Sequence, residues 1–439
     1  MPVRFLRVTL ASVAAFGGII LAVLSWIFTG QRSSPKGATA EDLRLETLVE
    51  TSSPELAAGL RQASQWLNQL AQRQGISAEV LALAAHGLLT FGRTEESIRL
   101  WQRCLEIDPN FVPAICGLAE CFVGSGDTEQ ALKYFRRAAE IEPTSTGHQI
   151  KIAQELMRLA QSDQVIELLE PVLRRHPNDV AILVLLGQAY VHKKEYEKAV
   201  LVLERAINLA PTLTNAYYAL AQATFALEEK ELAKEYLKVF QHLKERDEEA
   251  HRQVLRTQDD RREILRSLAE FYSRIATAFL AAGDAQTAEL ILLEARKLSP
   301  ECNPPLELLA WLYHRQGRRQ DCLAILEELA KRVDYLPGQL LCGTLFNELG
   351  LFHQAEQALL RGVELAPHQA PGYTALASFY LRWQRKLPSA RAAALRALDL
   401  DPCVENCELV AATCTALGDT ASVQAAKELA AVLRQQPQE

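Results

Sequence analysis

Apolar residues recur along most of this chain at the spacing of amphipathic helices, and residues 54–74 form one such helix. Ahead of it, residues 8–30 are an uncharged, largely apolar run of 23 residues. A helix of that length crosses a hydrocarbon core of about 30 Å. Residues 31–40, QRSSPKGATA, are polar and rich in helix breakers. The pattern predicts an all-α chain with a transmembrane anchor in 1–30, a linker in 31–40 and capping helices in 41–77.

The alternative to an anchor is a cleavable signal peptide, because residues 38–40 have the small-x-small form of a cleavage site. That site lies about ten residues beyond the apolar run, which is longer than a usual signal core. We therefore expect an uncleaved, single-pass membrane protein. Arg4 and Arg7 before the span nearly balance Arg32 and Lys36 after it, and this tips the expected topology slightly toward an extracytoplasmic body. A body that faces the cytoplasm is the alternative.

Ala14, Gly18 and Ala22 lie on one stripe of the predicted span. Small residues at this spacing let two helices approach closely, so a homodimer contact is possible there. The alternative is that Ala and Gly are simply common in spanning helices. The nine cysteines, an odd number without a regular pairing pattern, favour a reducing compartment and so oppose the expected orientation.

The rest of the chain repeats with a period of 34 residues, because Pro109, Pro143, Pro177 and Pro211 are evenly spaced. A fixed period of this size is typical of a solenoid whose units share one continuous core. Small residues such as Ala131 recur in one column of the repeat, with bulky residues one turn later. These columns resemble the tetratricopeptide repeat family, whose unit is two antiparallel helices. The resemblance implies a right-handed α-solenoid.

Nine such units are expected. Units one to five span 78–247, units six to nine span 269–404, and residues 405–439 form a C-terminal cap. Residues 248–268 are an extra segment, dense in charges of both signs and without Gly or Pro. They are interpreted as a solvated lengthening of two neighbouring helices. The alternative is a docking arm or a hinge.

Composition supports helices and weakens the case for some functions. The chain has 70 Leu and 63 Ala against 21 Gly and 18 Pro, which favours helix over sheet. The net charge is −7, and the four cations of residues 1–40, which include no acid, leave −11 for the rest. Such a body is not a general nucleic-acid binder. The nine scattered histidines form no metal motif, and no Gly-rich phosphate loop is present, so no catalysis, metal or cofactor is expected.

The resemblance also implies where a partner binds, because the first helix of each unit lines the concave face. Three glutamines occupy one equivalent position of that face, flanked by apolar residues. Primary amides can bond an extended peptide backbone while apolar neighbours receive its side chains. The predicted groove comprises Ile150, Gln154, Met157, Val184, Gln188, Val191, Asn215, Tyr218, Gln222 and Phe225. The alternative is that the glutamines are ordinary exposed residues and that curvature buries the apolar positions.

Family members that grip a terminal carboxylate use Lys, Asn and Arg on this face. Here the corresponding positions hold Ala82, Cys116, Ile150, Val184 and Tyr218, so that mode is not expected. A secondary candidate surface comprises Glu307, Trp311, His314 and Arg315, where Trp311 is either an anchor for a partner or a packing residue.

These features predict a non-catalytic scaffold, held at a membrane, that binds partner proteins or extended peptides. It looks like the anchored bacterial repeat proteins that assist secretion or envelope assembly. The alternative is a regulatory or substrate-presenting subunit of an enzyme or of an assembly complex. The fold alone does not choose between the two.

Overall fold

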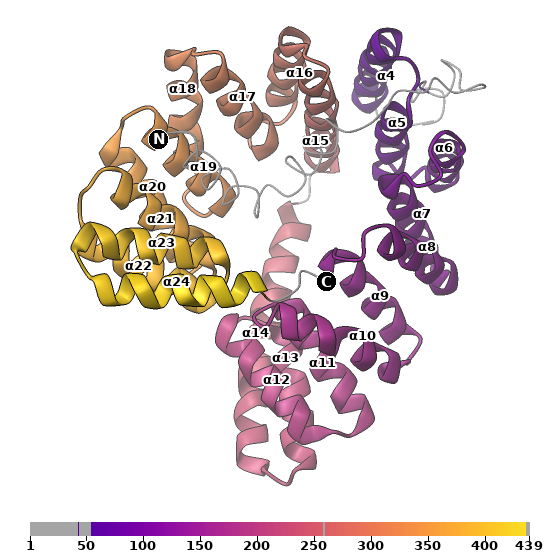
Figure 1. The fold of residues 1–439 in the computed structure, drawn as a ribbon. Helices are drawn as coiled ribbons and strands as arrows, with labels where there is room; N and C mark the ends of the chain where they lie inside the picture. The colour runs from indigo at the N-terminus through magenta and orange to yellow at the C-terminus, as the bar shows by residue number, and fades with distance from the viewer. Residues whose placement is uncertain (1–42, 44–53, 258–259, 436–439) are drawn as a thin grey trace. The chain divides into compact units, whose positions relative to one another are not determined.

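A computed structural model describes residue 43 and residues 54–257 and 260–435 of the chain. This part contains 21 α-helices and no strand (Figure 1). The chain folds into two compact units, and the division between them falls between Ile264 and Leu265. The predicted all-α class is therefore confirmed for the described residues.

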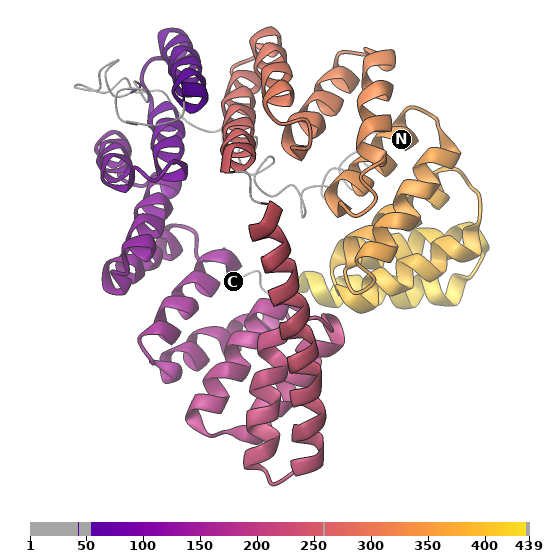
Figure 2. The ribbon, with the colours of Figure 1, turned by 180° about the vertical axis from the view of Figure 1, so that it is seen from behind.

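The amino-terminal unit consists of helix hairpins that follow one another along the chain. Its helices are α4 (Pro54–Gln74), α5 (Ala78–Thr90), α6 (Thr94–Ile107), α7 (Val112–Ser125), α8 (Thr128–Ile141), α9 (Thr146–Arg158), α10 (Ser162–Arg175), α11 (Val180–Lys193), α12 (Tyr196–Leu209), α13 (Thr214–Ala226) and α14 (Lys230–Thr257). From α5 on, each helix packs on the next one in the chain, and α9 and α13 both also pack on α11. Helix α14 has 28 residues against 13 in α13, and its end extends past its neighbours (Figure 2).

The carboxyl-terminal unit repeats this plan. Its helices are α15 (Asp260–Ala281, from Leu265 on), α16 (Ala285–Leu298), α17 (Asn303–Arg315), α18 (Arg319–Ala330), α19 (Leu336–Glu348), α20 (Phe352–Leu365), α21 (Ala370–Arg382), α22 (Leu387–Leu400), α23 (Val404–Leu417) and α24 (Thr420–Gln435). Packing between alternate helices, such as α17 with α19 and α19 with α21, connects successive hairpins. The hairpins thus form a stack rather than isolated pairs.

Local sequence sets where the helices begin and end. Asp127 and Asp179 cap α8 and α11, because each carboxylate accepts a bond from a backbone N–H of the first turn. Helices α6 and α8 end two residues before Pro109 and Pro143. Proline cannot continue a helix, so the regular prolines separate consecutive hairpins.

Small residues let the paired helices pack closely. A Cβ atom added to Gly187 of α11 would lie 2.3 Å from Cγ of Leu203 in α12. The same relation recurs in the other unit, where Gly343 of α19 faces Leu359 of α20 at 2.5 Å. Leu203 is fully buried, and Leu359 nearly so. The small column and the bulky column therefore interlock at the helix crossing.

The predicted single-pass membrane localisation is corrected by the structure. Among the described residues, no helix is both long enough and apolar enough to cross a membrane. The longest of them, α14, carries charged residues of both signs along its length. The expected span at 8–30, and with it the homodimer stripe of Ala14, Gly18 and Ala22, lies outside the described residues.

Candidate functional site

The predicted groove residues lie on three helices of the amino-terminal unit. They are distributed over α9, α11 and α13, which are the first helices of three consecutive hairpins. Helix α11 contacts both α9 and α13 directly. The equivalent positions of the three helices therefore follow one another within a single compact unit.

The three glutamines of the predicted groove occupy equivalent positions of α9, α11 and α13 and so form a row. Their side chains have unused hydrogen-bonding groups. Gln154 and Gln222 are exposed, and Gln188 is half-buried. In the part of the chain that the structure describes, none of the three side-chain amides forms a hydrogen bond. Each amide offers an acceptor and two N–H donors. The row can therefore exchange hydrogen bonds with an incoming backbone.

The apolar positions beside the glutamines differ along the row. Ile150, Met157, Val184 and Val191 are half-buried and pack against the core of the unit. These four side chains are thus partly covered within the unit. The apolar part of the predicted groove is therefore reduced on α9 and α11.

Helix α13 presents the most exposed apolar surface of the row. Tyr218 is 47% exposed and Phe225 is 65% exposed, with the exposed Gln222 between them on the same helix face. Asn215, one turn before Tyr218, is exposed as well. Two aromatic rings and two amides thus share one side of α13.

The long helix α14 supports this surface, which the sequence did not predict. The ring of Phe240 lies 5.2 Å from the ring of Tyr218, centroid to centroid. The Thr214 hydroxyl donates to a carboxylate oxygen of Asp247 at 2.7 Å. Helix α14 thus lies along α13 as far as Thr214, the first residue of α13. Phe240 lies 22 residues after Tyr218, so only the hairpin brings the two rings together.

The secondary candidate surface lies on α17, and its members have separate partners. Glu307 accepts a hydrogen bond from the Tyr335 hydroxyl. Burial raises the pKa of Glu307, while that bond and the charge of Arg332 oppose the shift. His314 pairs with Glu348 of α19 at 2.6 Å. Glu307 and His314 therefore both contact the repeat that follows α17.

Trp311 and Arg315 complete this surface. Trp311 is half-buried, and its ring meets the His314 ring edge-on at 6.2 Å. Arg315 is exposed. The four residues lie on one face of α17, and two of them, Glu307 and His314, bond to residues of the next repeat.

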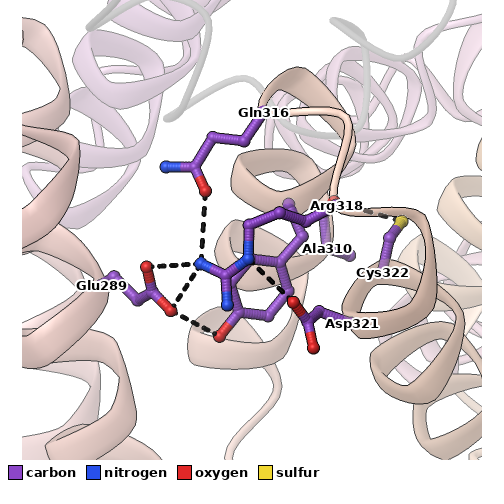
Figure 3. Close-up of polar contacts among 7 residues, drawn as sticks. Glu289, Ala310, Gln316, Arg318, Asp321 and Cys322 are labelled. Carbon is purple, nitrogen blue, oxygen red and sulfur yellow. Dashed lines mark hydrogen bonds and ion pairs between the residues drawn. The ribbon is translucent and has the colours of Figure 1, made fainter.

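A polar cluster next to this helix has a structural role (Figure 3). Nη1 of Arg318 donates to both carboxylate oxygens of Glu289 at 2.8 and 2.7 Å, and Nε donates to Asp321 at 2.8 Å. The Tyr313 hydroxyl donates to the same Glu289 at 3.0 Å, and the guanidinium lies over the Tyr313 ring. Burial and Glu289 raise the pKa of Tyr313 to about 12. The cluster joins α16 to the next hairpin.

This combination recurs in other repeats. Tyr380 bonds to Glu356 of the preceding hairpin, and Lys386 pairs with that carboxylate at 2.6 Å. In the amino-terminal unit, the Tyr190 hydroxyl donates to Glu170 at 2.6 Å. A buried tyrosine hydroxyl needs a partner, and a carboxylate one hairpin earlier provides it. Such contacts hold successive repeats in register.

Comparisons with known proteins support the repeat family. Models of the tetratricopeptide repeat match residues 112–145 and 156–223. No curated protein sequence matches the chain. Solved structures similar to it include MamA from Desulfovibrio magneticus RS-1, at 20% identity over 39% of this chain and 97% of that one, with a TM-score of 0.37.

Two further structures have comparable scores. YrrB, described as a tetratricopeptide repeat protein with an unusual peptide-binding site, is 16% identical over 40% of this chain and 91% of its own, with a TM-score of 0.36. Yeast Tom70 is 15% identical over 82% of this chain and 93% of its own, with a TM-score of 0.34. The family predicted from the repeat columns is confirmed by the two family-model matches.

Proposed function

We propose that this tetratricopeptide repeat protein is a non-catalytic scaffold that binds an extended, largely uncharged peptide segment along α9, α11 and α13. Arrays of this family are in general protein-interaction scaffolds with extended binding surfaces. The observation that carries the proposal is the row of three unbonded glutamine amides. Such amides can bond a peptide backbone in the manner of an added strand.

The chemistry of the predicted groove favours an uncharged ligand. None of its ten residues is Asp, Glu, Lys, Arg or His, although the chain as a whole is 23% charged. A charged ligand side chain would lose hydration against this surface without gaining a counter-ion. The exposed rings of Tyr218 and Phe225 offer apolar contact at the α13 end of the row.

The test is a triple substitution of Gln154, Gln188 and Gln222 by Glu. Peptides from a library of neutral, extended sequences are titrated against the full chain by fluorescence anisotropy. Each amide–backbone bond contributes about 0.5–1.5 kcal/mol, so losing three weakens binding by roughly tenfold to a thousandfold.

A matched control carries the same three charges elsewhere, through Gln102→Glu, Gln130→Glu and Gln241→Glu, all at exposed positions of the same unit. The control should retain the affinity of the unaltered chain. Equal affinity of the two triple variants would refute the proposal. A pull-down with the full chain tests the alternative function. If it recovers one enzyme in a stoichiometric complex instead of several client proteins, the chain is better described as a regulatory subunit.

A further inference from the structure

Three side chains from consecutive elements meet in the amino-terminal unit in the order of a thiol, a base and a carboxylate. Sγ of Cys116 in α7 lies 3.9 Å from Nδ1 of His148 in α9. Nε2 of His148 lies 2.9 Å from a carboxylate oxygen of Glu142, the C-cap residue that follows α8. A carboxylate oxygen accepts hydrogen bonds, so Nε2 of His148 donates to Glu142, and Nδ1 is the ring nitrogen that faces the thiol.

The surroundings keep this thiol protonated until the base acts. Burial, together with the charges of Glu120 and Glu142, raises the pKa of Cys116 to about 12, and the charge of Lys151 opposes the shift. Cys116 is half-buried, so a small reagent can reach it. Few thiolates of this residue exist at neutral pH, and reaction therefore requires a proton acceptor in contact with the sulfur. His148 is in that position.

The arrangement does not suit acyl transfer, although thiol hydrolases use the same order of groups. Acyl transfer needs N–H donors for a developing oxyanion. Of the three residues before Cys116, Pro113 has no N–H, and the N–H groups of Ala114 and Ile115 already bond to the Phe111 carbonyl. Thiol–disulfide exchange develops no oxyanion, so it remains the compatible reaction.

We infer that Cys116 captures a disulfide-bearing ligand as a mixed disulfide, with His148 accepting the thiol proton. The Cys116 sulfur bonds to one ligand sulfur while the ligand S–S bond breaks. The second ligand sulfur leaves as a thiolate and takes up the proton from His148. The ligand disulfide is the only oxidant required. This inference does not depend on peptide binding along α9, α11 and α13.

The chain supplies its own control. Cys403 is also half-buried, and burial raises the pKa of its thiol to about 12 as well. In the described residues, its polar neighbours include acids but no imidazole. The full reduced chain is treated with a neutral dipyridyl disulfide at neutral pH, and modification of each cysteine is followed by peptide mass spectrometry. Cys116 should react at least about tenfold faster than Cys403. Equal rates would overturn the inference.

Two variants test the mechanism. In His148→Gln, the rate at which the disulfide modifies Cys116 should fall about tenfold or more at neutral pH. That rate should then increase tenfold per pH unit, because the thiol has to ionise without a base beside it. The unaltered chain should show a shallower pH dependence. Glu142→Leu removes both the charge and the hydrogen-bond acceptor for Nε2 of His148. Removing the negative charge alone would accelerate the modification of Cys116, whereas loss of the acceptor that orients His148 should slow it. An unchanged rate in His148→Gln, or acceleration in Glu142→Leu, contradicts the proposal.

Discussion

The close contact between α11 and α12 leads to a quantitative prediction for Gly187→Ala. The new Cβ would lie 2.3 and 2.4 Å from Cγ and Cδ2 of Leu203, whereas ordinary contacts are 3.4–4 Å. Leu203 is fully buried and cannot swing into solvent. The helices must separate or the leucine must leave its rotamer, and such overpacking costs about 1–3 kcal/mol.

The matched control is Gly124→Ala in α7, where nothing lies within 4 Å of the added Cβ. Both substitutions gain up to about 1 kcal/mol from the better helix propensity of alanine. Their difference therefore isolates the packing term. Urea unfolding followed by circular dichroism should place Gly187→Ala about 1–3 kcal/mol below Gly124→Ala.

A double variant checks the cause. In a Leu203→Ala background the atoms that obstruct the Cβ are gone, so Gly187→Ala should no longer destabilise the chain. If Gly187→Ala is as stable as Gly124→Ala, or if its cost persists without Leu203, the interlocking of the two columns is not the reason for glycine at this position.

Three more predictions concern the described surfaces. Tyr313→Phe removes the hydroxyl bound to Glu289 and should lower the free energy of unfolding by about 1 kcal/mol, measured by urea titration. Phe225→Ala removes a ring that is 65% exposed, so it should change stability by less than about 0.5 kcal/mol while weakening binding of neutral peptides in the anisotropy assay. Glu307 has a raised pKa in the folded chain, so its contribution is favourable below its ordinary value of 4.5 and is lost as pH rises through the raised pKa. Glu307→Gln should therefore gain stability relative to the unaltered chain between acidic and neutral pH, as measured by unfolding at several pH values.

The first two of these predictions have control variants, and the third has an outcome that would contradict it. Tyr134 forms no side-chain hydrogen bond in the described part, so Tyr134→Phe should leave stability nearly unchanged. Leu201 is 72% exposed on α12, so Leu201→Ala controls for the loss of apolar surface outside the row. A gap between Glu307→Gln and the unaltered chain that stays constant with pH would contradict the burial of an ionising carboxyl.

Much of the fold followed from local signals. The evenly spaced prolines and the small residue at Ala131 predicted hairpins of two helices, because each proline ends a helix and each small side chain permits a close crossing. These causes act within one repeat, so a period in the sequence carries them. The glutamine row was predicted in the same way, from equivalent positions of successive repeats.

The contacts between repeats were not predictable from these signals. Val184 and Tyr218 occupy equivalent positions, yet one is half-buried and the other is 47% exposed. Their exposure depends on which neighbouring helix covers them. The expected membrane span in 8–30 lies outside the described residues, and no described helix has the length and apolarity to cross a membrane.

The sequence by itself determined the helical class, the repeat period and the family, because backbone propensity, capping and helix crossing depend on residues close together in the chain. Only the tertiary structure decided which side chains remain available. It placed Phe240 beside Tyr218 and brought Cys116, His148 and Glu142 together from α7, the end of α8 and α9. Such groupings depend on how hairpins stack, and stacking brings together residues that no period in the sequence relates.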